Sequence, residues 1–339
     1  MKPRIVFVER KFWESVSLEK VFAQIDKSIP KDKFETSFVQ LPYLNNLLGV
    51  VKNFIFFKKP EADIYHITGH IHYIALILPK KKTVLTIADL TILRTRKGLR
   101  RFIIKKLFFD LPVKKIKYIT AISEATKDEI IQSTNCEREK IRVIEVPLQD
   151  ILHLNAKKTF NTQCPTILQV GSAPHKNIIN LAKALNGVNC RLRIIGKLNE
   201  ELLNELKINK IEFTNDFNLN DGEIKDEYRK ADIVAFCSIY EGFGLPIIEA
   251  QAMHTPVVTS NLSPMKEVAG GGAMLVNPED VLSIKDGILR IINDESLRNE
   301  LITQGLENIK RFETSRVASQ YESLYREIIE AENVLNSQL

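Results

Sequence analysis

The sequence predicts an α/β protein with two domains, each built on a parallel β-sheet whose strands are connected by helices. A length of 339 residues suits two domains of ordinary size. Short apolar runs alternate with helical stretches along the whole chain, and this alternation favours parallel sheets with crossover helices. The polar stretch 155–165 separates two such series and is the best candidate for a linker.

The first series occupies residues 1–150. Helical patterns cover 18–28, 99–109 and 124–133, and Ser123 fits the N-cap of the third helix. The strand candidates are short apolar runs at 5–8, 34–41, 64–67, 82–87, 118–122 and 140–146. Six strands with helices between them are enough for one complete parallel sheet.

The second series repeats this alternation. Its strand candidates are 166–170, 191–195, 211–213, 233–236, 257–259 and 273–276, with helices at 178–185, 223–229 and 281–293. A last helix from Thr314 to about Ser337 has an apolar stripe but belongs to no strand–helix unit.

The composition is 44% hydrophobic and 27% charged, which is typical of a soluble globular protein. No apolar run approaches the roughly 18 residues of a membrane span, and the run 5–8 is too short for a signal-peptide core. The cysteines show no CxxC spacing, so we expect a reduced, cytoplasmic setting. They are Cys136, Cys164, Cys190 and Cys237.

Charge is divided unevenly along the chain. Residues 1–150 hold 28 Lys and Arg against 17 Asp and Glu, a net charge of +11, whereas the remainder has a net charge of −5. The basic residues are densest between Arg94 and Lys117, where Phe102 and Leu107 interleave with cations. Such a basic amphipathic helix can lie on anionic lipid, although a solvated helix face over a core explains the same pattern. No nucleic-acid-binding module accompanies the charge.

The most informative motif lies between the strand-like run 231–238 and the helix-like run 246–254. Gly242 and Gly244 allow the backbone to approach a ligand closely, because glycine has no Cβ. Pro246 fits the first turn of a helix, where its missing N–H costs nothing.

The same motif offers groups for an anion and for hydroxyls. The amides of Phe243, Gly244 and Leu245 would point out of a helix N-terminus, which is an anion site. Glu241 and Glu249 stand on either side, and carboxylates suit hydroxyl donors. Phosphate and hydroxyl groups together describe a sugar nucleotide. The alternative is a capped surface helix with two incidental glutamates.

A second glycine turn, at 170–177, follows a strand and opens a helix. Gly171 with Lys176 at a helix N-terminus suits a diphosphate, since the lysine is a point charge and the amides add oriented dipoles. Many strand-to-helix turns look similar, so the turn at 170–177 indicates a diphosphate site only in combination with the motif around Glu241.

The stretch from Tyr240 to Pro256, continuing to Pro278, resembles the retaining glycosyltransferases of family 4, which have the GT-B fold. The resemblance extends from about residue 63 to 293. It implies two Rossmann-like domains whose parallel sheets face each other across a cleft. These would be an acceptor-binding domain at 1–155 and a nucleotide-sugar-binding domain at 160–315, with a helix at 316–339 that crosses back to the first domain.

The resemblance also implies roles for residues. Glu241 would hold the donor sugar, Glu249 the ribose and Lys176 the diphosphate, with Glu241, Lys176 and Asp89 as the catalytic group. The family's arginine close before the lysine is missing here, and Ser172 or His175 stands in the shorter loop instead. The full set of donor-binding residues implied is Gly171, Ser172, His175, Lys176, Tyr240, Gly242, Phe243, Gly244, Leu245 and Glu249.

The segment 86–90 resembles the family's T-(I/V)-H-D motif, whose histidine reaches the transferred sugar. Ala88 stands at the histidine position, while Asp89 is in place. Either a neighbouring histidine takes over, or the activity is altered, or the substitution disables the enzyme. His66, His70 and His72 are the neighbours. They could also suggest a metal site, but no cysteine or carboxylate cluster and no DxD pair accompanies them, so we expect no metal and a loop on the acceptor side.

We therefore expect a retaining, metal-independent hexosyltransferase that needs no cofactor beyond its donor, a UDP-sugar or GDP-sugar. The acceptor would be a sugar hydroxyl of a lipid-linked glycan or surface polysaccharide precursor, such as one for lipopolysaccharide. The enzyme would be cytoplasmic or peripheral on the inner face of the membrane. Ala88 and the missing arginine keep open a second hypothesis, a sugar-nucleotide-binding subunit without transfer activity. A sugar-nucleotide epimerase of the same fold is a third.

Overall fold

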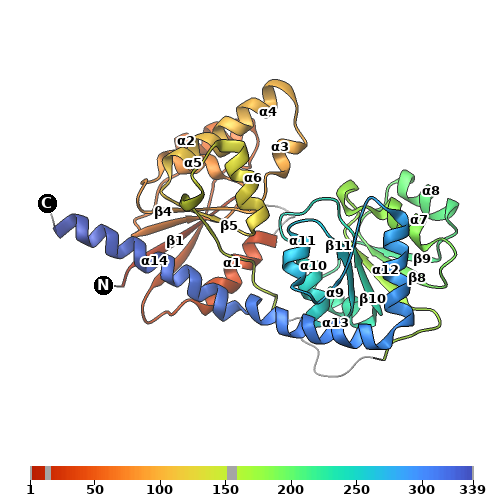
Figure 1. Cartoon of the computed structure of the whole chain (residues 1–339). Helices are drawn as coiled ribbons and strands as arrows, with labels where there is room; N and C mark the ends of the chain where they lie inside the picture. Colours follow the sequence, from red (N-terminus) through yellow and green to blue (C-terminus); the bar gives the residue numbers. More distant parts are fainter. Residues whose placement is uncertain (1, 12–16, 151–158, 338–339) are drawn as a thin grey trace. The chain divides into compact units, whose positions relative to one another are not determined.

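A computed structural model describes residues 2–11, 17–150 and 159–337. The chain divides into two compact units (Figure 1). Unit 1 comprises Met1–Pro147 with Thr314–Leu339, and unit 2 comprises Leu148–Glu313. Residues 155–158 of the predicted linker lie outside the described residues. Within the described part of the chain, no helix is both long and apolar enough to cross a membrane.

Unit 1 is built on a six-stranded parallel sheet with the strand order β2-β1-β3-β4-β5-β6. The predicted strands are confirmed, with β6 shorter than expected. They are β1 (Arg4–Glu9), β2 (Glu35–Gln40), β3 (Ile64–Ile67), β4 (Thr83–Ile87), β5 (Tyr118–Ala121) and β6 (Ile141–Val143). The helical elements are α1 (Ser17–Ser28), α2 (Leu47–Phe56), η1 (His72–Ile77), α3 (Thr91–Arg94), α4 (Gly98–Ile104), η2 (Lys105–Asp110), α5 (Leu111–Lys115), α6 (Glu124–Thr134), η3 (Arg138–Lys140) and α14 (Thr314–Ser337).

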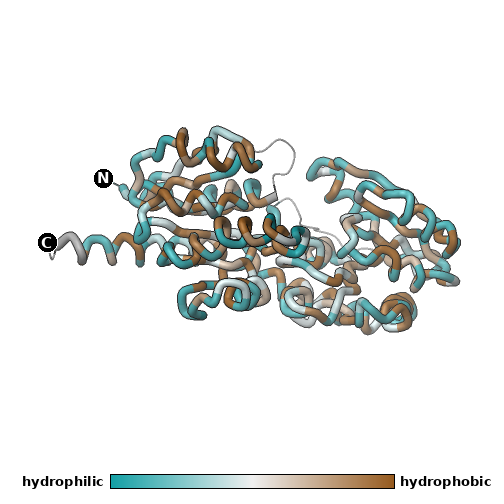
Figure 2. The backbone as a smooth tube through the Cα atoms, turned by 90° about the horizontal axis from the view of Figure 1, so that it is seen from above, coloured by the Kyte–Doolittle hydropathy of each residue, from teal (hydrophilic) through white to brown (hydrophobic). Residues whose placement is uncertain are grey.

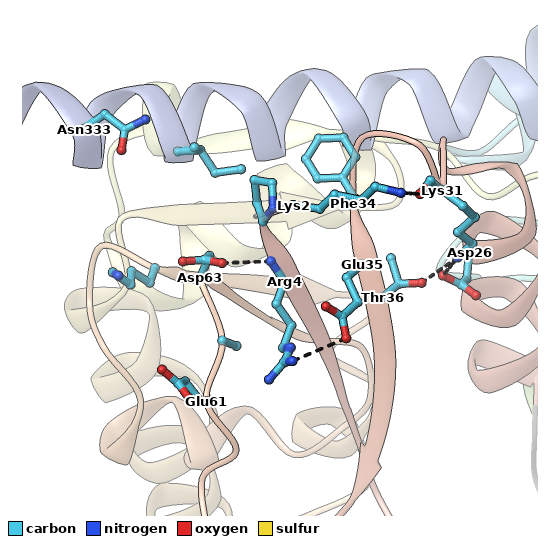
Figure 3. Close-up of a pocket in the computed structure, with 14 residues that line it drawn as sticks. Lys2, Arg4, Asp26, Lys31, Phe34, Glu35, Thr36, Glu61, Asp63 and Asn333 are labelled. Carbon is cyan, nitrogen blue, oxygen red and sulfur yellow. Dashed lines mark hydrogen bonds and ion pairs between the residues drawn. The ribbon is translucent and has the colours of Figure 1, made fainter.

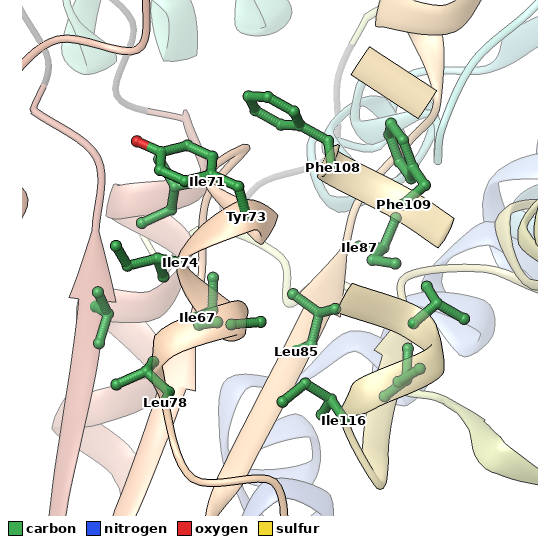
Figure 4. Close-up of a cluster of buried hydrophobic side chains, with 14 of the residues drawn as sticks. Ile67, Ile71, Tyr73, Ile74, Leu78, Leu85, Ile87, Phe108, Phe109 and Ile116 are labelled. Atoms are coloured by element: carbon green, nitrogen blue, oxygen red, sulfur yellow. The ribbon is translucent and has the colours of Figure 1, made fainter. Parts of the chain in front are cut away.

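Both faces of this sheet are covered. Along β1, Val6 and Val8 belong to a core under η1 and η2, which Figure 4 shows, whereas Ile5 and Phe7 belong to a core under α1 and α14. This is the pattern of a buried parallel strand, which is apolar on both sides. Helix α14 contacts α1 and β3 within unit 1.

The helix predicted over 99–109 is confirmed as helical, but it is longer and less regular than expected. It consists of α4, then the π-helix η2, then α5 with Pro112 in its first turn. The segment between α4 and α5 is a π-helix, which has a wider turn than a regular α-helix. The adjacent residues Phe108 and Phe109 of this segment are both buried. Helix α2 was missed because its outward side is apolar too, which removes the amphipathic pattern.

Unit 2 is built on a second six-stranded parallel sheet, with the order β12-β11-β10-β7-β8-β9. Its strands are β7 (Thr166–Val170), β8 (Arg191–Ile195), β9 (Phe213–Asp216), β10 (Ile233–Phe236), β11 (Val257–Ser260) and β12 (Met274–Val276). The helical elements are η4 (Pro174–Lys176), α7 (Ile178–Leu185), α8 (Glu200–Ile208), α9 (Asp221–Lys230), α10 (Leu245–Ala252), α11 (Met265–Ala269), α12 (Val281–Asn293), α13 (Glu295–Asn308) and η5 (Ile309–Phe312).

The six strands predicted for unit 2 are found, but β9 begins two residues later than expected, and α8, α11 and α13 were not predicted. Apolar and polar segments alternate along the helices of the chain (Figure 2), as expected for helices that cover a sheet with one face. The predicted cap is confirmed in unit 1, where the Ser123 hydroxyl accepts a hydrogen bond from the Thr126 amide.

Candidate functional site

The candidate site of unit 2 lies where β7 and β10 end, at the carboxyl edge of the sheet, which is where open parallel sheets bind ligands. Two hydrogen bonds tie the loops that follow these strands. The Ile239 amide donates to the His175 carbonyl at 2.8 Å, and Asn177 Nδ2 donates to the Cys237 carbonyl at 3.0 Å. The two predicted motifs are therefore parts of one structure.

Two glycines shape the turn after β7. Gly171 has a φ of +89°, and a Cβ there would lie 2.8 Å from Lys176 Cε. Gly196, at the end of the neighbouring β8, has a φ of +155°, and a Cβ there would lie 2.7 Å from Ser172 Oγ. Glycine is required at both positions because of the positive φ and the close approach of a side chain. The turn therefore holds Lys176 directly over the backbone of Gly171.

Lys176 forms the central contact of the site. Its Nζ lies 2.7 Å from Glu241 Oε1, and the two side chains are only 15% and 13% exposed. The same Nζ lies 4.5 Å from the centroid of the Phe236 ring, a cation–π arrangement. His175 Nε2 lies 3.9 Å from the same carboxylate oxygen. The structure thus brings together Lys176, His175 and Glu241 from two loops.

Glu249 is buried on α10, and its carboxylate is already bonded. Oε2 accepts a hydrogen bond of 2.5 Å from the hydroxyl of Tyr228, which is fully buried on α9. Burial raises the pKa of Glu249 above its ordinary value, while the Tyr228 hydroxyl and the positive charge of Lys176 act in the lowering direction. One carboxylate oxygen is therefore fixed, and the other is oriented by it.

In the loop before α10, the candidate ligand-binding groups are backbone groups rather than side chains. Gly244 is the N-cap residue with a φ of +116°, and the first helical hydrogen bond runs from the Ile247 amide to the Gly244 carbonyl. The Phe243 ring is buried against Phe312, at 5.7 Å between centroids, so the ring is not available to a ligand. Leu245 begins the helix, and Pro246 occupies its first turn as predicted.

Asp89 and Ala88 lie at the carboxyl end of β4, in unit 1. Asp89 Oδ1 accepts a hydrogen bond from the Thr91 amide at 2.8 Å, and Oδ2 lies 3.5 Å from His70 Nε2. The His70 side chain is 30% exposed. Ala88, which precedes Asp89 in the sequence, is buried. His70 therefore contacts the aspartate of the motif, next in sequence to the position where the family has its histidine.

The other two histidines have structural roles. His66 is buried between the Tyr325 hydroxyl, 2.6 Å from Nδ1, and the Thr86 hydroxyl, 2.7 Å from Nε2. His72 Nδ1 lies 3.0 Å from the Phe108 carbonyl. Burial lowers the pKa of both histidines to about 3, so both are neutral. Over residues 2–11, 17–150 and 159–337, no three His, Cys, Asp or Glu side chains are grouped as metal ligands.

Three contributors to the site were missed from the sequence. Tyr228 and Phe236 look like ordinary core residues, and only the fold places them beside Glu249 and Lys176. Gly196 carried a usable signal, since a glycine directly after a strand indicates a close approach of backbone.

A cavity of about 1210 Å³ lies elsewhere, around the amino ends of β1 and β2 (Figure 3). Several of its charged groups pair with one another: Arg4 pairs with Glu35, and Lys31 pairs with Asp26. Open parallel sheets bind ligands at the carboxyl ends of their strands, so this cavity at the amino ends is a weaker candidate for a ligand site than the one in unit 2.

Comparison with known proteins agrees with this geometry. Residues 151–308 match the family model for glycosyl transferases group 1, which confirms the resemblance over that part of the chain. O-antigen chain mannosyltransferase RfbU of Salmonella typhimurium is 32% identical over 204 residues, 56% of this chain and 56% of that protein. O-antigen chain mannosyltransferase B of Escherichia coli is 36% identical over 110 residues, 31% of this chain and 29% of that protein. The chain thus covers about half or less of these curated relatives.

A solved structure supports the fold over nearly the whole chain. The crystal structure of Anabaena Alr3699/HepE in complex with UDP and glucose superposes with a TM-score of 0.76, covering 96% of this chain and 100% of that one at 16% identity. The predicted fold class, α/β of the GT-B type with two parallel sheets, is confirmed.

The glycine turn can be tested by stability. Gly171→Ala should destabilise unit 2 by about 1 kcal/mol more than Gly187→Ala. Both residues have a positive φ, but a Cβ at Gly187 meets nothing within 4 Å, whereas one at Gly171 meets Lys176. Adding Lys176→Ala should recover part of the difference. Denaturant unfolding would measure all three variants, and equal losses at the two glycines would show that the lysine does not depend on the turn.

Proposed function

We propose that the chain is a glycosyltransferase that moves a hexose from a nucleoside diphosphate sugar to a hydroxyl group of another sugar. The observation that carries this proposal is the mostly buried Lys176–Glu241 ion pair between the Gly171 turn and the N-terminus of α10. A cation and helix amides suit the diphosphate, and the two carboxylates suit hydroxyls. The match to glycosyl transferases group 1 covers this same part of the chain.

Donor binding would rearrange the ion pair. Lys176 would turn from Glu241 to the incoming diphosphate, which carries more negative charge than one carboxylate. Glu241 would then accept hydrogen bonds from the donor sugar, and Glu249 would accept those from the ribose. Ser172, His175 and Tyr240 would line the donor, with the backbone of Gly171, Gly242, Phe243, Gly244 and Leu245.

The transfer step would follow from the same contacts. The bond from the sugar C1 to the diphosphate oxygen breaks, and Lys176 with the amides of 243–245 stabilises the leaving negative charge. The acceptor oxygen bonds to C1 on the same face, and its proton passes to an oxygen of the leaving diphosphate. Configuration at C1 is retained without a protein nucleophile, unlike in a glycosidase that uses two carboxylates.

The acceptor would be a lipid-linked glycan or surface polysaccharide precursor, since two relatives are named as O-antigen chain mannosyltransferases. Unit 1 would bind it, and the chain would work at the inner face of the membrane, with the basic region from Arg94 to Lys117 in contact with lipid. The segment is helical from α4 through η2 to α5, and the cations Arg100, Arg101 and Lys106 lie on its exposed side.

The second candidate is a sugar-nucleotide-binding subunit without transfer activity, which Ala88 favours. His70 argues for activity, because it lies 3.5 Å from Asp89 beside the vacant position. Donor turnover measured with and without a glycan acceptor separates the two functions.

Lys176→Ala should weaken binding of UDP or GDP by roughly 10- to 150-fold, the loss expected for a hydrogen bond to a charged group. Affinity for the uncharged nucleoside should change little, because only the phosphates carry the countercharge. Isothermal titration calorimetry would measure both. Lys207→Ala, on the exposed side of α8, is the matched control and should bind normally. Equal losses for nucleotide and nucleoside would remove Lys176 from the diphosphate site.

Nucleotide affinity should fall at acidic pH as Glu249 is protonated, since a neutral carboxyl is a poorer acceptor for ribose hydroxyls. Tyr228→Phe removes the hydrogen bond that acts to lower the pKa of Glu249, so the fall should begin at higher pH. Affinity measured from pH 5 to 8 for the wild type and the variant tests this. Superimposable profiles would contradict the ribose role of Glu249.

His70→Ala should lower the rate of transfer and leave nucleotide affinity unchanged, because an interaction made only in the transition state affects turnover rather than binding. Ala88→His should also lower the rate, by crowding a buried position already served by His70. A rate increase in Ala88→His would instead identify this chain as an impaired transferase.

The proposed mechanism uses Lys176 and backbone amides where other enzymes use a divalent cation. EDTA should therefore leave the transfer rate intact. Loss of activity on chelation, with recovery on adding Mg²⁺ or Mn²⁺, would replace the metal-free mechanism.

A further inference from the structure

Two helices of unit 1 expose large apolar side chains. Helix α2 exposes Leu47 at 78%, Leu48 at 73% and Ile55 at 67% of their surface, together with Val51 and Phe56. Helix α4 has no buried residue, and it exposes Leu99 at 73%, Phe102 at 58% and Ile103 at 45%. Single exposed apolar residues are common, but several on each of two helices indicate an interaction surface.

The two helices belong to one side of the sheet. The Phe54 ring of α2 lies 5.4 Å from the Tyr73 ring of η1, and the Tyr73 ring lies 5.0 Å from the Phe108 ring of η2, which continues α4. Tyr73 and Phe108 belong to the core cluster in Figure 4. The inward residues of α2 and η2 thus flank η1 over one core.

The charged residues within the sequence of these two segments are of one sign. Neither 36–60 nor 90–109 contains an Asp or Glu, whereas 90–109 contains seven Lys and Arg residues. Some of these cations are engaged: Arg94 pairs with Glu129, and Lys105 pairs with Asp110. The remaining cations nearest to Leu99 and Phe102 are Arg96, Lys97 and Arg100. Their side chains are exposed and make no hydrogen bond or ion pair among the residues that the structure describes.

We propose that this apolar–basic face docks onto the surface of an anionic lipid bilayer. The face consists of Leu47, Leu48, Val51, Ile55 and Phe56 of α2, Leu99, Phe102 and Ile103 of α4, and the cations Arg96, Lys97 and Arg100. Apolar side chains enter the boundary of headgroups and acyl chains, while Lys and Arg remain among the anionic headgroups. Both classes of side chain occur here, without a carboxylate between them in the sequence of either helix.

The proposal adds a membrane-docking surface to the proposed function, in which the acceptor is lipid-linked. It rests on that function only for the reason why the protein would bind a membrane. Helix α2 is the new element, because the basic segment alone could be a solvated surface. An apolar helix and unpaired cations on the same side of the sheet give the lipid two independent attractions. The charge is also what selects the bilayer over a second copy of the chain, since two copies of a cationic face repel each other.

Co-sedimentation with vesicles tests the proposal on the full chain. The wild type should sediment with phosphatidylcholine vesicles that contain about 30% phosphatidylglycerol, and much less with pure phosphatidylcholine. The charge variant Arg96→Ala/Lys97→Ala/Arg100→Ala should bind the anionic vesicles about a hundredfold more weakly, because each cation contributes about fivefold. The apolar variants Leu47→Ser/Ile55→Ser and Leu99→Ser/Phe102→Ser should each lose at least tenfold.

Matched variants on unit 2 control for surface charge and apolarity in general. They are Lys183→Ala/Lys207→Ala/Lys230→Ala and Ile208→Ser/Leu282→Ser, all at exposed positions. Both should sediment like the wild type. Every variant should keep the melting temperature and UDP or GDP affinity of the wild type, so failure of docking is distinguishable from failure of the donor site.

Three results would overturn the proposal. The first is a wild type that binds neither kind of vesicle. The second is an apolar variant that binds as tightly as the wild type, because α2 or α4 would then not enter the lipid. The third is a wild type that dimerises without lipid in sedimentation velocity while Leu99→Ser/Phe102→Ser is monomeric, which would assign the face to a second copy.

Discussion

The ion pair between Lys176 and Glu241 organises the carboxyl edge of the sheet in unit 2. Its geometry depends on Gly171, because any Cβ there would occupy the space of the lysine stem. It also depends on the bonds that tie the loop after β7 to the loop after β10. Two mostly buried charges are held close to each other but not sealed from solvent, so an anionic ligand that took the place of Glu241 would keep the Lys176 charge compensated.

The same edge shows why the sequence was informative about one part of the site and silent about another. The spacing from Glu241 to Glu249 is set by local backbone demands, namely two glycines, a proline and one helix, and such demands are visible in sequence. Tyr228 lies 21 positions before Glu249 and reaches it only through the packing of α9 on the sheet. No local pattern distinguishes a tyrosine that orients a carboxylate from one that fills a core.

In unit 1, too, local sequence patterns predicted some elements and missed others. Its strands were predictable because each is a short apolar run, but α2 was not, since a helix that is apolar on its outer side has no periodic pattern. Three histidines lie within seven residues of the sequence but have different environments. Burial lowers the pKa of His66 and His72 and makes them neutral core residues, whereas His70 is partly exposed and lies 3.5 Å from Asp89. The chemistry of each histidine is thus decided by burial, which the spacing does not encode.

The most direct measurement is a crystal structure of the protein with UDP or GDP bound. The account predicts a diphosphate oxygen about 3 Å from Lys176 Nζ, with the bond to Glu241 broken and the ribose hydroxyls on Glu249. A nucleotide bound away from the Gly171 turn, with the Lys176–Glu241 pair intact, would contradict it.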